Sequence, residues 1–336
     1  MNVNEKLVIS AVLCGSLFMV VYVVHSVGLS IGEIAAAKTH FMAFKYLGSL
    51  LGVLMGISII VMLSKSLRVK NSMKEIFEIK PIKFLEIVPI RKIRIRDAFL
   101  IMLLVIFELP LVNFLDELGK GIFGDYTQVF GTLSEKTNFF VFVLGLSIFG
   151  PILEELLTRG LVLYQFRSYN PVIAVIITTV TFSVMHANPH QATYTLSSSI
   201  IYTLVTFATG SILASILAHG IHNLIATVFV YYFPEVTISQ WYVVIPCTII
   251  VVILLYILLK KSKVMSYWKG EKTDLIFPCV FLFVFTAFFV MDPNVKSYEL
   301  FVFWYFTCIG LYICKQITMK NRIAAIKVDN FQEDSK

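Results

Sequence analysis

Charged residues are scarce in this chain. Asp, Glu, Lys and Arg make up only 15% of its 336 residues, whereas a soluble globular domain carries about 25%. Hydrophobic residues account for 58%. This balance excludes an ordinary soluble protein and leaves a lipid bilayer as the solvent for most side chains. Because the apolar runs have the length of helices, we expect an all-α polytopic membrane protein.

Cysteine pairs and familiar metal-binding motifs are missing. The five cysteines lie in or beside apolar runs, and none forms a C-x-x-C pair. The sequence therefore indicates neither a disulfide framework nor a thiolate metal site. No H-E-x-x-H motif is present. A cleavable signal peptide is not expected, because the first apolar run, 7–27, is too long and lacks a small-residue cleavage site.

Ten apolar segments are candidates for transmembrane helices, which need about 20 mostly apolar residues. We predict about ten spans, with a core helical bundle that holds any functional site. At Gly210 and Ser211 the chain forms either a turn between two spans or the tip of a bent, re-entrant hairpin. The predicted spans are 7–28, 42–64, 98–116, 138–164, 171–187, 194–210, 212–232, 241–259, 275–291 and 298–314.

Lys and Arg gather on one side of these spans. Of the 28 basic residues, 22 fall in segments that share a side with the N-terminus, above all 65–97 and 260–272 and the C-terminal tail. By the positive-inside rule both termini are cytoplasmic. We expect a multi-pass protein of a cytoplasmic membrane, and a bacterial one, since no organelle signal or lipidation motif appears. The loop 65–97 either lies against an anionic leaflet or is an ordinary cytoplasmic loop.

The expected partners follow from the same pattern. Basic residues punctuate the apolar segments and form no continuous stripe, so the lipid bilayer is expected as a partner and nucleic acid is not. We divide the chain into N-terminal transmembrane helices with the basic loop (1–137), a core segment (138–232), and C-terminal transmembrane helices with a cytoplasmic tail (233–336).

The fourth span contains three ionisable residues, which are rare in lipid because each costs about 2.5–3.5 kcal/mol at a helix centre. It reads FGPILEELLTRG and includes Glu154, Glu155 and Arg159. Glu155 and Arg159 are four residues apart, so the arginine can neutralise this carboxylate. Glu154 points about 100° away and is free to face a cavity. Pro151 is expected to loosen the preceding turn and free a carbonyl near the site.

Two further spans supply polar partners at helical spacing. Phe182 and His186 are four residues apart in the fifth span, and His219 and Asn223 are four apart in the seventh. A carboxylate in apolar surroundings can take a proton from water, and a histidine with an amide can donate hydrogen bonds to an oxyanion. This set could hydrolyse a peptide bond in a restricted cavity. Alternatively, Glu154, His186 and His219 would bind a divalent metal such as zinc; no other cofactor is expected.

For the remaining histidines the sequence predicts no definite catalytic role. His222 lies on an adjacent stripe of the seventh span and either lines the site or packs. His190, His25 and His40 are expected at ordinary surface or interface positions. At 1.5 Å per residue from the cytoplasmic helix ends, His186 would lie deeper than His219. Helix tilt, or a different start of the fifth span, would bring the two level.

The three motifs in this order resemble those of the membrane-embedded CAAX-protease and bacteriocin-processing (CPBP, or Abi) family. The pattern is E-E-x-x-x-R, F-x-x-x-H and H-x-x-x-N, and it extends over roughly 138–232. The resemblance implies an intramembrane endopeptidase that acts on a membrane-associated or secreted peptide or protein. Both metal-dependent and metal-free glutamate mechanisms are argued for this family.

The resemblance also implies roles for single residues. Glu154 would activate the attacking water together with His186. His219 and Asn223 would hold the oxyanion or complete a metal site. The Glu–Arg pair of the fourth span would support this geometry.

Two other classes of function fit the sequence. A noncatalytic scaffold or regulator, or a bacteriocin-immunity protein, could use the same fold. A transporter or channel is the third possibility, since acidic residues within spans also build proton relays. No paired inverted repeat with broken helices is evident, which counts against transport.

Overall fold

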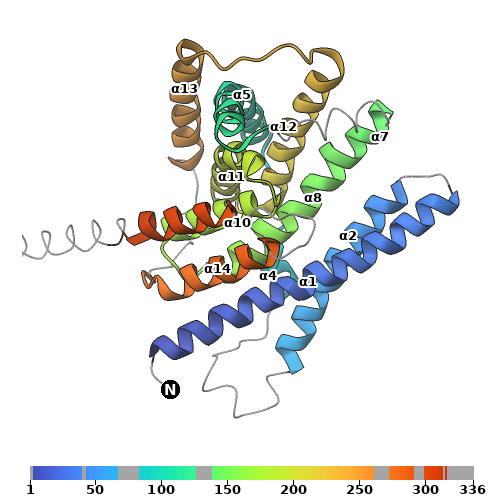
Figure 1. The fold of residues 1–336 in the computed structure, drawn as a ribbon, viewed down its shortest axis with the longest axis vertical. Coiled ribbons are helices and arrows are strands. Elements are labelled where there is room, and N and C mark those ends of the chain that lie inside the picture. The colour runs from blue at the N-terminus through green and yellow to red at the C-terminus, as the bar shows by residue number, and fades with distance from the viewer. Residues whose placement is uncertain are drawn as a thin grey trace, which may run out of the picture.

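The computed structural model describes residues 3–39, 43–66, 83–125, 138–260, 272–290 and 299–312, and Lys315. Within these residues the regular structure is helical, apart from an isolated parallel bridge between Tyr169 and Lys272. The prediction of an all-α fold is confirmed. Figure 1 shows the helices in chain order. They are α1 (Val3–Thr39), α2 (Ala43–Ser66), α4 (Phe84–Ile87), α5 (Ile95–Phe123), α7 (Phe139–Val143), η2 (Leu144–Phe149), α8 (Gly150–Glu155), η3 (Leu156–Val162), α9 (Leu163–Gln165), α10 (Pro171–Val184), α11 (Pro189–Thr209), α12 (Ile212–Tyr232), α13 (Trp241–Lys260) and α14 (Ile276–Val290), followed by a helix at Leu300–Tyr312.

Six helical stretches are long and apolar enough to cross a membrane, which makes this a multi-pass membrane protein. They lie at Val20–Lys38, Phe44–Met62, Ile95–Phe123, Phe139–Gln165, Ile212–Tyr232 and Trp241–Lys260. Three more predicted spans are shorter apolar helices, at Pro171–Val184, Ile276–Ala287 and Leu300–Tyr312. The tenth, α11, has 21 residues but is rich in Ser and Thr. A count of ten crossings therefore stays a prediction, as does the division at 137 and 232.

Short polar side chains cap the N-termini of the core helices. Asn138 caps α7, Asn170 caps α10 and Asn188 caps α11, each by accepting a hydrogen bond from a backbone N–H of the first turn. Ser211 does the same for α12. Gly210, with φ 67°, ends α11 in the left-handed conformation that glycine tolerates best. The turn at Gly210 thus separates two distinct helices.

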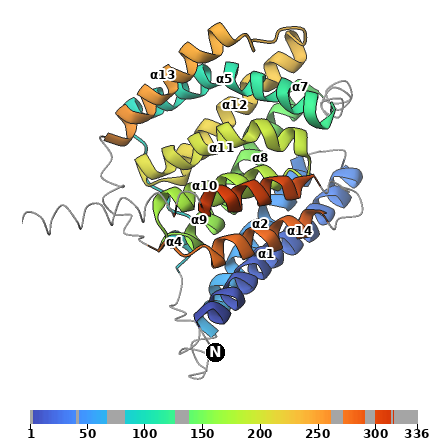
Figure 2. The same ribbon diagram turned by 60° about the vertical axis from the view of Figure 1, so that its left-hand side comes forward.

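The core helices lie between two outer groups. In Figures 1 and 2, α8, α10, α11 and α12 occupy the middle of the molecule. α5 and α13 cover one side, and α1, α2 and α14 cover the other. Five of the six candidate site residues lie on α8, η3 and α12, and His186 lies in the turn that follows α10.

α1 and α2 form a hairpin with direct backbone contact. A Cβ atom on Gly28 would overlap the Gly48 carbonyl oxygen, and one on Gly32 would overlap the Phe44 carbonyl oxygen. Gly28 and Gly32 form a GxxxG motif, as do Gly48 and Gly52, a pattern that lets membrane helices approach closely. Sequence reasoning did not single out these glycines.

Parts of the predicted basic loop and tail lie outside the described residues. Of the loop 65–97, residues 67–82 are not described, and His40 and 316–336 are likewise outside. The described part of the loop joins the core, because the Ser211 hydroxyl donates to the Arg91 carbonyl at 2.8 Å and accepts from the Arg91 N–H at 3.0 Å.

Candidate active site

The helix that contains the two glutamates is wound irregularly. Between Phe139 and Gln165 its hydrogen bonding changes from α to π in η2, back to α in α8, and to π again in η3. Single π-helical turns are rare and occur often at functional sites. Glu154 and Glu155 lie in the short α8 segment between the two π-helical stretches.

Pro151 leaves a backbone carbonyl free for the site, as the sequence predicted. In η2 the Gly150 N–H donates to the Gly145 carbonyl, five residues back. The corresponding donor for the Leu146 carbonyl would be residue 151, but proline has no N–H. The Asn223 side chain fills this place and donates to the Leu146 carbonyl at 2.7 Å. The proline therefore fixes an α12 side chain against the glutamate helix.

Arg159 is fully buried and links its own segment, η3, to two neighbouring helices. Its guanidinium donates to Glu155 Oε1 at 3.0 Å, and both side chains have 0% exposure. It also donates to the Ser199 carbonyl at 2.7 Å and to the Ser199 hydroxyl at 2.5 Å. The group lies 4.7 Å from the centre of the Phe182 ring, within cation–π range. This arginine is thus a structural link between η3, α10 and α11, and the expected neutralisation of Glu155 is present.

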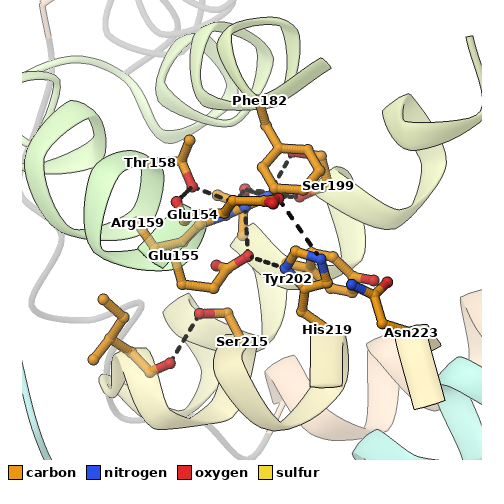
Figure 3. A network of polar contacts seen from close by, with 12 residues as sticks. Glu154, Glu155, Thr158, Arg159, Phe182, Ser199, Tyr202, Ser215, His219 and Asn223 are labelled. Carbon is orange, nitrogen blue, oxygen red and sulfur yellow. Dashed lines mark hydrogen bonds and ion pairs between the residues drawn. The ribbon is translucent and has the colours of Figure 1, made fainter. Parts of the chain in front are cut away.

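Glu155 also holds His219. The same Oε1 atom lies 3.0 Å from His219 Nδ1. A carboxylate paired with an arginine only accepts hydrogen bonds, so Nδ1 bears the proton and Nε2 is the free nitrogen of neutral His219. This arrangement resembles the carboxylate–histidine pairs that orient catalytic imidazoles. Figure 3 shows Glu155 between Arg159 and His219.

Glu154 faces the two histidines predicted from the sequence. Its Oε2 atom lies 3.6 Å from His186 Nε2 and 3.8 Å from His219 Nε2. This oxygen is buried and has no hydrogen-bond partner among the described residues. Both imidazoles reach one carboxylate oxygen, so the expected difference in their depth is absent from the tertiary structure. Tilted helices do not preserve depth counted along the sequence.

The tautomer of His186 follows from its backbone partner. Nδ1 lies 2.8 Å from the Phe182 carbonyl oxygen, which can only accept. Nδ1 therefore carries the proton, and Nε2 is an acceptor when the ring is neutral. The turn after α10 contributes to this position, because Ala187, next to His186, has a φ of 56°.

Aromatic rings pack around the histidines. Tyr202 of α11 stacks on His219, with 4.9 Å between ring centres and 18° between planes. Phe182 makes edge-on contacts with His186 at 5.0 Å and with His219 at 5.5 Å. The phenylalanine of the F-x-x-x-H motif thus contacts both imidazoles and Arg159, which restricts their rotamers.

A cavity of about 900 Å³ opens onto this cluster. Glu154, His186, His219 and Asn223 line it, and His222 does so as well. Its volume is in the upper range for ligand sites. Glu155 and Arg159 do not line it. The structure therefore brings all six predicted residues together but divides them into four that face the cavity and two that support them.

Comparison with known proteins agrees with the motif pattern. Residues 136–225 match the family model described as type II CAAX prenyl endopeptidase, Rce1-like. This stretch is a CAAX-protease-like domain. The match includes every predicted site residue and supports a protease of the intramembrane kind. No curated protein and no solved structure matches the chain significantly.

The candidate metal ligands of the CAAX-protease-like domain are of the right chemical types for a metal ion, but their positions in the structure do not form a metal site. Two imidazole Nε2 atoms and a carboxylate are usual zinc ligands. Within the described part of the chain, however, no group of three or more His, Cys, Asp or Glu side chains is positioned to hold a metal ion. We derive no step through a metal, and Glu154, His186 and His219 stay a predicted ligand set.

Sequence reasoning missed several residues of the domain and its surroundings. Ser199, Thr203 and Tyr202 of α11 surround Arg159, but Ser, Thr and Tyr give no distinctive signal in an apolar helix. Glu108 of α5 is fully buried and accepts from the Ser197 hydroxyl at 2.9 Å. The rule that ionisable residues within a span deserve attention would have found Glu108.

Two of the other histidines differ in burial. His190, expected at an ordinary surface or interface position, is 1% exposed, and its Nε2 lies 2.8 Å from Asp116 Oδ1. His190 therefore lies at the interface between the start of α11 and α5, which agrees with the interface position that was expected as one alternative. His25 is half-buried between α1 and α2, with its Nε2 2.5 Å from the Ser49 hydroxyl, which agrees with an interface position.

Proposed function

We propose that this protein is an intramembrane endopeptidase of a cytoplasmic membrane, in which Glu154 and His186 activate a water molecule for attack on a peptide bond. The observation that supports this proposal is the approach of Glu154 Oε2 to two imidazole Nε2 atoms, at 3.6 and 3.8 Å, in the wall of a cavity. Within the described residues, that carboxylate oxygen has no other partner.

The hydrogen-bonding types at this point favour a water molecule. His186 Nε2 is an acceptor because Nδ1 donates to the Phe182 carbonyl. Ionised Glu154 is also an acceptor, so the two groups repel unless a donor lies between them. A water molecule can donate one proton to each and present its lone pairs to a substrate carbonyl. In the attack, one of these protons passes to Glu154, which acts as general base and then protonates the leaving amine.

His219 and Asn223 serve the oxygen of the scissile carbonyl. In the doubly protonated form of His219, Nδ1 donates to the Glu155 carboxylate and Nε2 donates to the developing oxyanion. Asn223 uses one amide hydrogen for the Leu146 carbonyl and has a second available for the cavity. In peptidases, each hydrogen-bond donor to the oxyanion raises kcat by about 10²–10³-fold.

The test of this function compares two glutamate variants. Glu154→Gln keeps the size of the side chain but removes the base, whereas Glu117→Gln alters an exposed glutamate of α5 outside the cavity. Purified proteins in detergent are incubated with a library of membrane-anchored and soluble peptides, and products are identified by mass spectrometry. We expect cleavage by the parent and by Glu117→Gln, and a loss of at least about 100-fold in Glu154→Gln.

The same experiment separates the competing functions. Identical product patterns from parent and Glu154→Gln would refute the proposal and favour a noncatalytic scaffold, regulator or immunity protein. Cleavage that is lost in Glu154→Gln and also lost with a zinc chelator would instead support a metal held by Glu154, His186 and His219.

A further inference from the structure

One end of the helical bundle carries most of the described basic residues. Chain segments at this end are joined by hydrogen bonds: the Ile212 N–H donates to the Pro89 carbonyl at 2.9 Å, and the Asn170 N–H donates to the Lys272 carbonyl at 3.0 Å. A salt bridge of 3.5 Å links Arg167 with Glu86. The basic residues here, which we call the basic end, are Lys83, Arg91, Lys92, Arg94, Arg96, Arg167, Lys260 and Lys272.

The opposite end of the bundle has few cations and several acids. Helix α5 ends there, α7 begins there, and Phe139 packs against Tyr231 with 5.3 Å between ring centres. Lys120 is bound to Asp116 at 2.7 Å, so its charge is compensated. Glu117 and Glu235 add negative charge. We call this the acidic end.

The cavity extends from the catalytic cluster to the acidic end. Beyond Glu154 and the histidines, α7, η2 and α11 contribute to its walls, and the last turns of α5 and α12 and the connection from α12 to α13 extend them to the acidic end. The wall residues in the last turns of these two helices and in the connection include Asp116, Lys120, Tyr231, Phe233, Val236 and Ile238.

Side chains fill the space between the cluster and the basic end. Leu161, Val162 and Phe166 of the glutamate helix are at most 2% exposed, and so are Ile177 of α10 and Ile212 of α12. They belong to one hydrophobic core cluster. Such packing excludes water, so the described residues offer a route to Glu154 from the acidic end and a closed core toward the basic end.

The charge asymmetry assigns these ends to sides of the membrane. Short loops that are rich in Lys and Arg stay in the cytoplasm. The chain segments 67–82 and 261–271, which continue from helix ends at the basic end, add seven more basic residues in the sequence: Arg68, Lys70, Lys74, Lys80, Lys261, Lys263 and Lys269. The basic end is therefore cytoplasmic, and the acidic end faces outward.

We infer that the catalytic cavity opens on the extracytoplasmic face of the membrane, and that its substrate is a peptide segment presented from that face. The claim about a substrate rests on the proposed peptidase function, whereas the orientation of the cavity does not depend on that function. The substrate class comprises secreted peptides that have crossed the bilayer and the outer juxtamembrane segments of membrane proteins. Peptides confined to the cytoplasm are excluded, because the packed core separates them from Glu154.

Cysteine labelling in intact cells tests the orientation without requiring activity. In a variant without its five native cysteines, single cysteines replace Val236 at the outer part of the cavity, Ala226 further inside it, or Lys92 at the basic end. A membrane-impermeant thiol reagent is applied before and after permeabilisation of the cytoplasmic membrane. We expect Val236→Cys and Ala226→Cys to react in intact cells, and Lys92→Cys to react only after permeabilisation. The reverse pattern would overturn the inference.

A second arm separates orientation from catalysis. An impermeant peptide that the purified protein cleaves is added to right-side-out and to inverted membrane vesicles. We expect cleavage in right-side-out vesicles at least 10-fold faster than in inverted ones. Cleavage confined to inverted vesicles would refute the orientation and leave the peptidase function standing. Outward labelling by a protein that cleaves no peptide would instead refute the peptidase function alone.

Discussion

His219 Nδ1 lies 3.0 Å from Glu155 Oε1, and the same oxygen accepts a hydrogen bond from Arg159 at 3.0 Å. One buried carboxylate thus neutralises a cation and orients an imidazole. The second carboxylate, on the adjacent residue, lies in the cavity wall. Two neighbouring glutamates therefore have separate tasks, because successive side chains of a helix point in different directions.

Glu155→Gln is expected to destabilise the fold as well as reduce cleavage. It leaves the fully buried Arg159 without its counter-charge, and removal of one partner of a buried pair costs about 3–5 kcal/mol. Thermal unfolding of the detergent-solubilised protein measures this effect. Glu86→Gln is the control, because it breaks the half-exposed salt bridge to Arg167, for which about 0–1 kcal/mol is expected. Equal melting temperatures of the two variants would contradict the structural role of the buried pair.

Pro151→Ala is expected to reduce cleavage through Asn223. The new N–H at residue 151 competes for the Leu146 carbonyl, which now accepts from Asn223 at 2.7 Å. We expect kcat to fall about 10-fold, less than the 10²–10³ typical when an oxyanion donor is removed outright. Asn223→Ala alone should show that larger loss.

The double variant Pro151→Ala/Asn223→Ala tests whether the two residues act together. Because the proline acts through the amide, the double variant should lose no more activity than Asn223→Ala. Additive losses would show that Pro151 affects the site by another route, such as a change in the π-helical turn.

Removal of divalent metal is expected to leave activity within about two-fold. The reason is that the proposed mechanism uses Glu154 as general base and assigns no step to an ion. Cleavage rates are measured after dialysis against a strong zinc chelator, and the metal content of the parent protein is determined in parallel. A stoichiometric metal whose loss abolishes cleavage, and whose return restores it, would replace the metal-free mechanism.

Gly48→Ala is expected to destabilise the hairpin of α1 and α2. A methyl group at this position overlaps the Gly28 carbonyl oxygen, with backbone on both sides and no flexible side chain to move. Overpacking of this kind costs about 1–3 kcal/mol. Gly121→Ala is the matched control on α5, since a Cβ there meets nothing within 4 Å. The melting temperature should fall for Gly48→Ala and stay level for Gly121→Ala.

The sequence alone indicated that a lipid bilayer surrounds most of the chain, and it predicted the class of fold and the candidate site residues. Long apolar runs predicted helices in a bilayer, and the spacing of Glu154, Glu155 and Arg159 correctly predicted which carboxylate the arginine neutralises. These features could be predicted because hydropathy and helical periodicity are local properties of a chain. The sequence also predicted a backbone carbonyl without a helical donor near Pro151, because proline has no N–H in any structural context.

Only the tertiary structure decided how the helices meet. The π-helical segments around Glu154 depend on packing between helices, which periodicity does not encode. The link from Arg159 to Ser199 joins residues 40 positions apart, and the burial of Glu108 required knowing which face of α5 meets α11. The approach of His186 and His219 to one oxygen depends on how α10 and α12 pack against the glutamate helix, which neither helix encodes alone. The end of the bundle at which the cavity opens is likewise a property of packed side chains from several helices, and no single segment carries it.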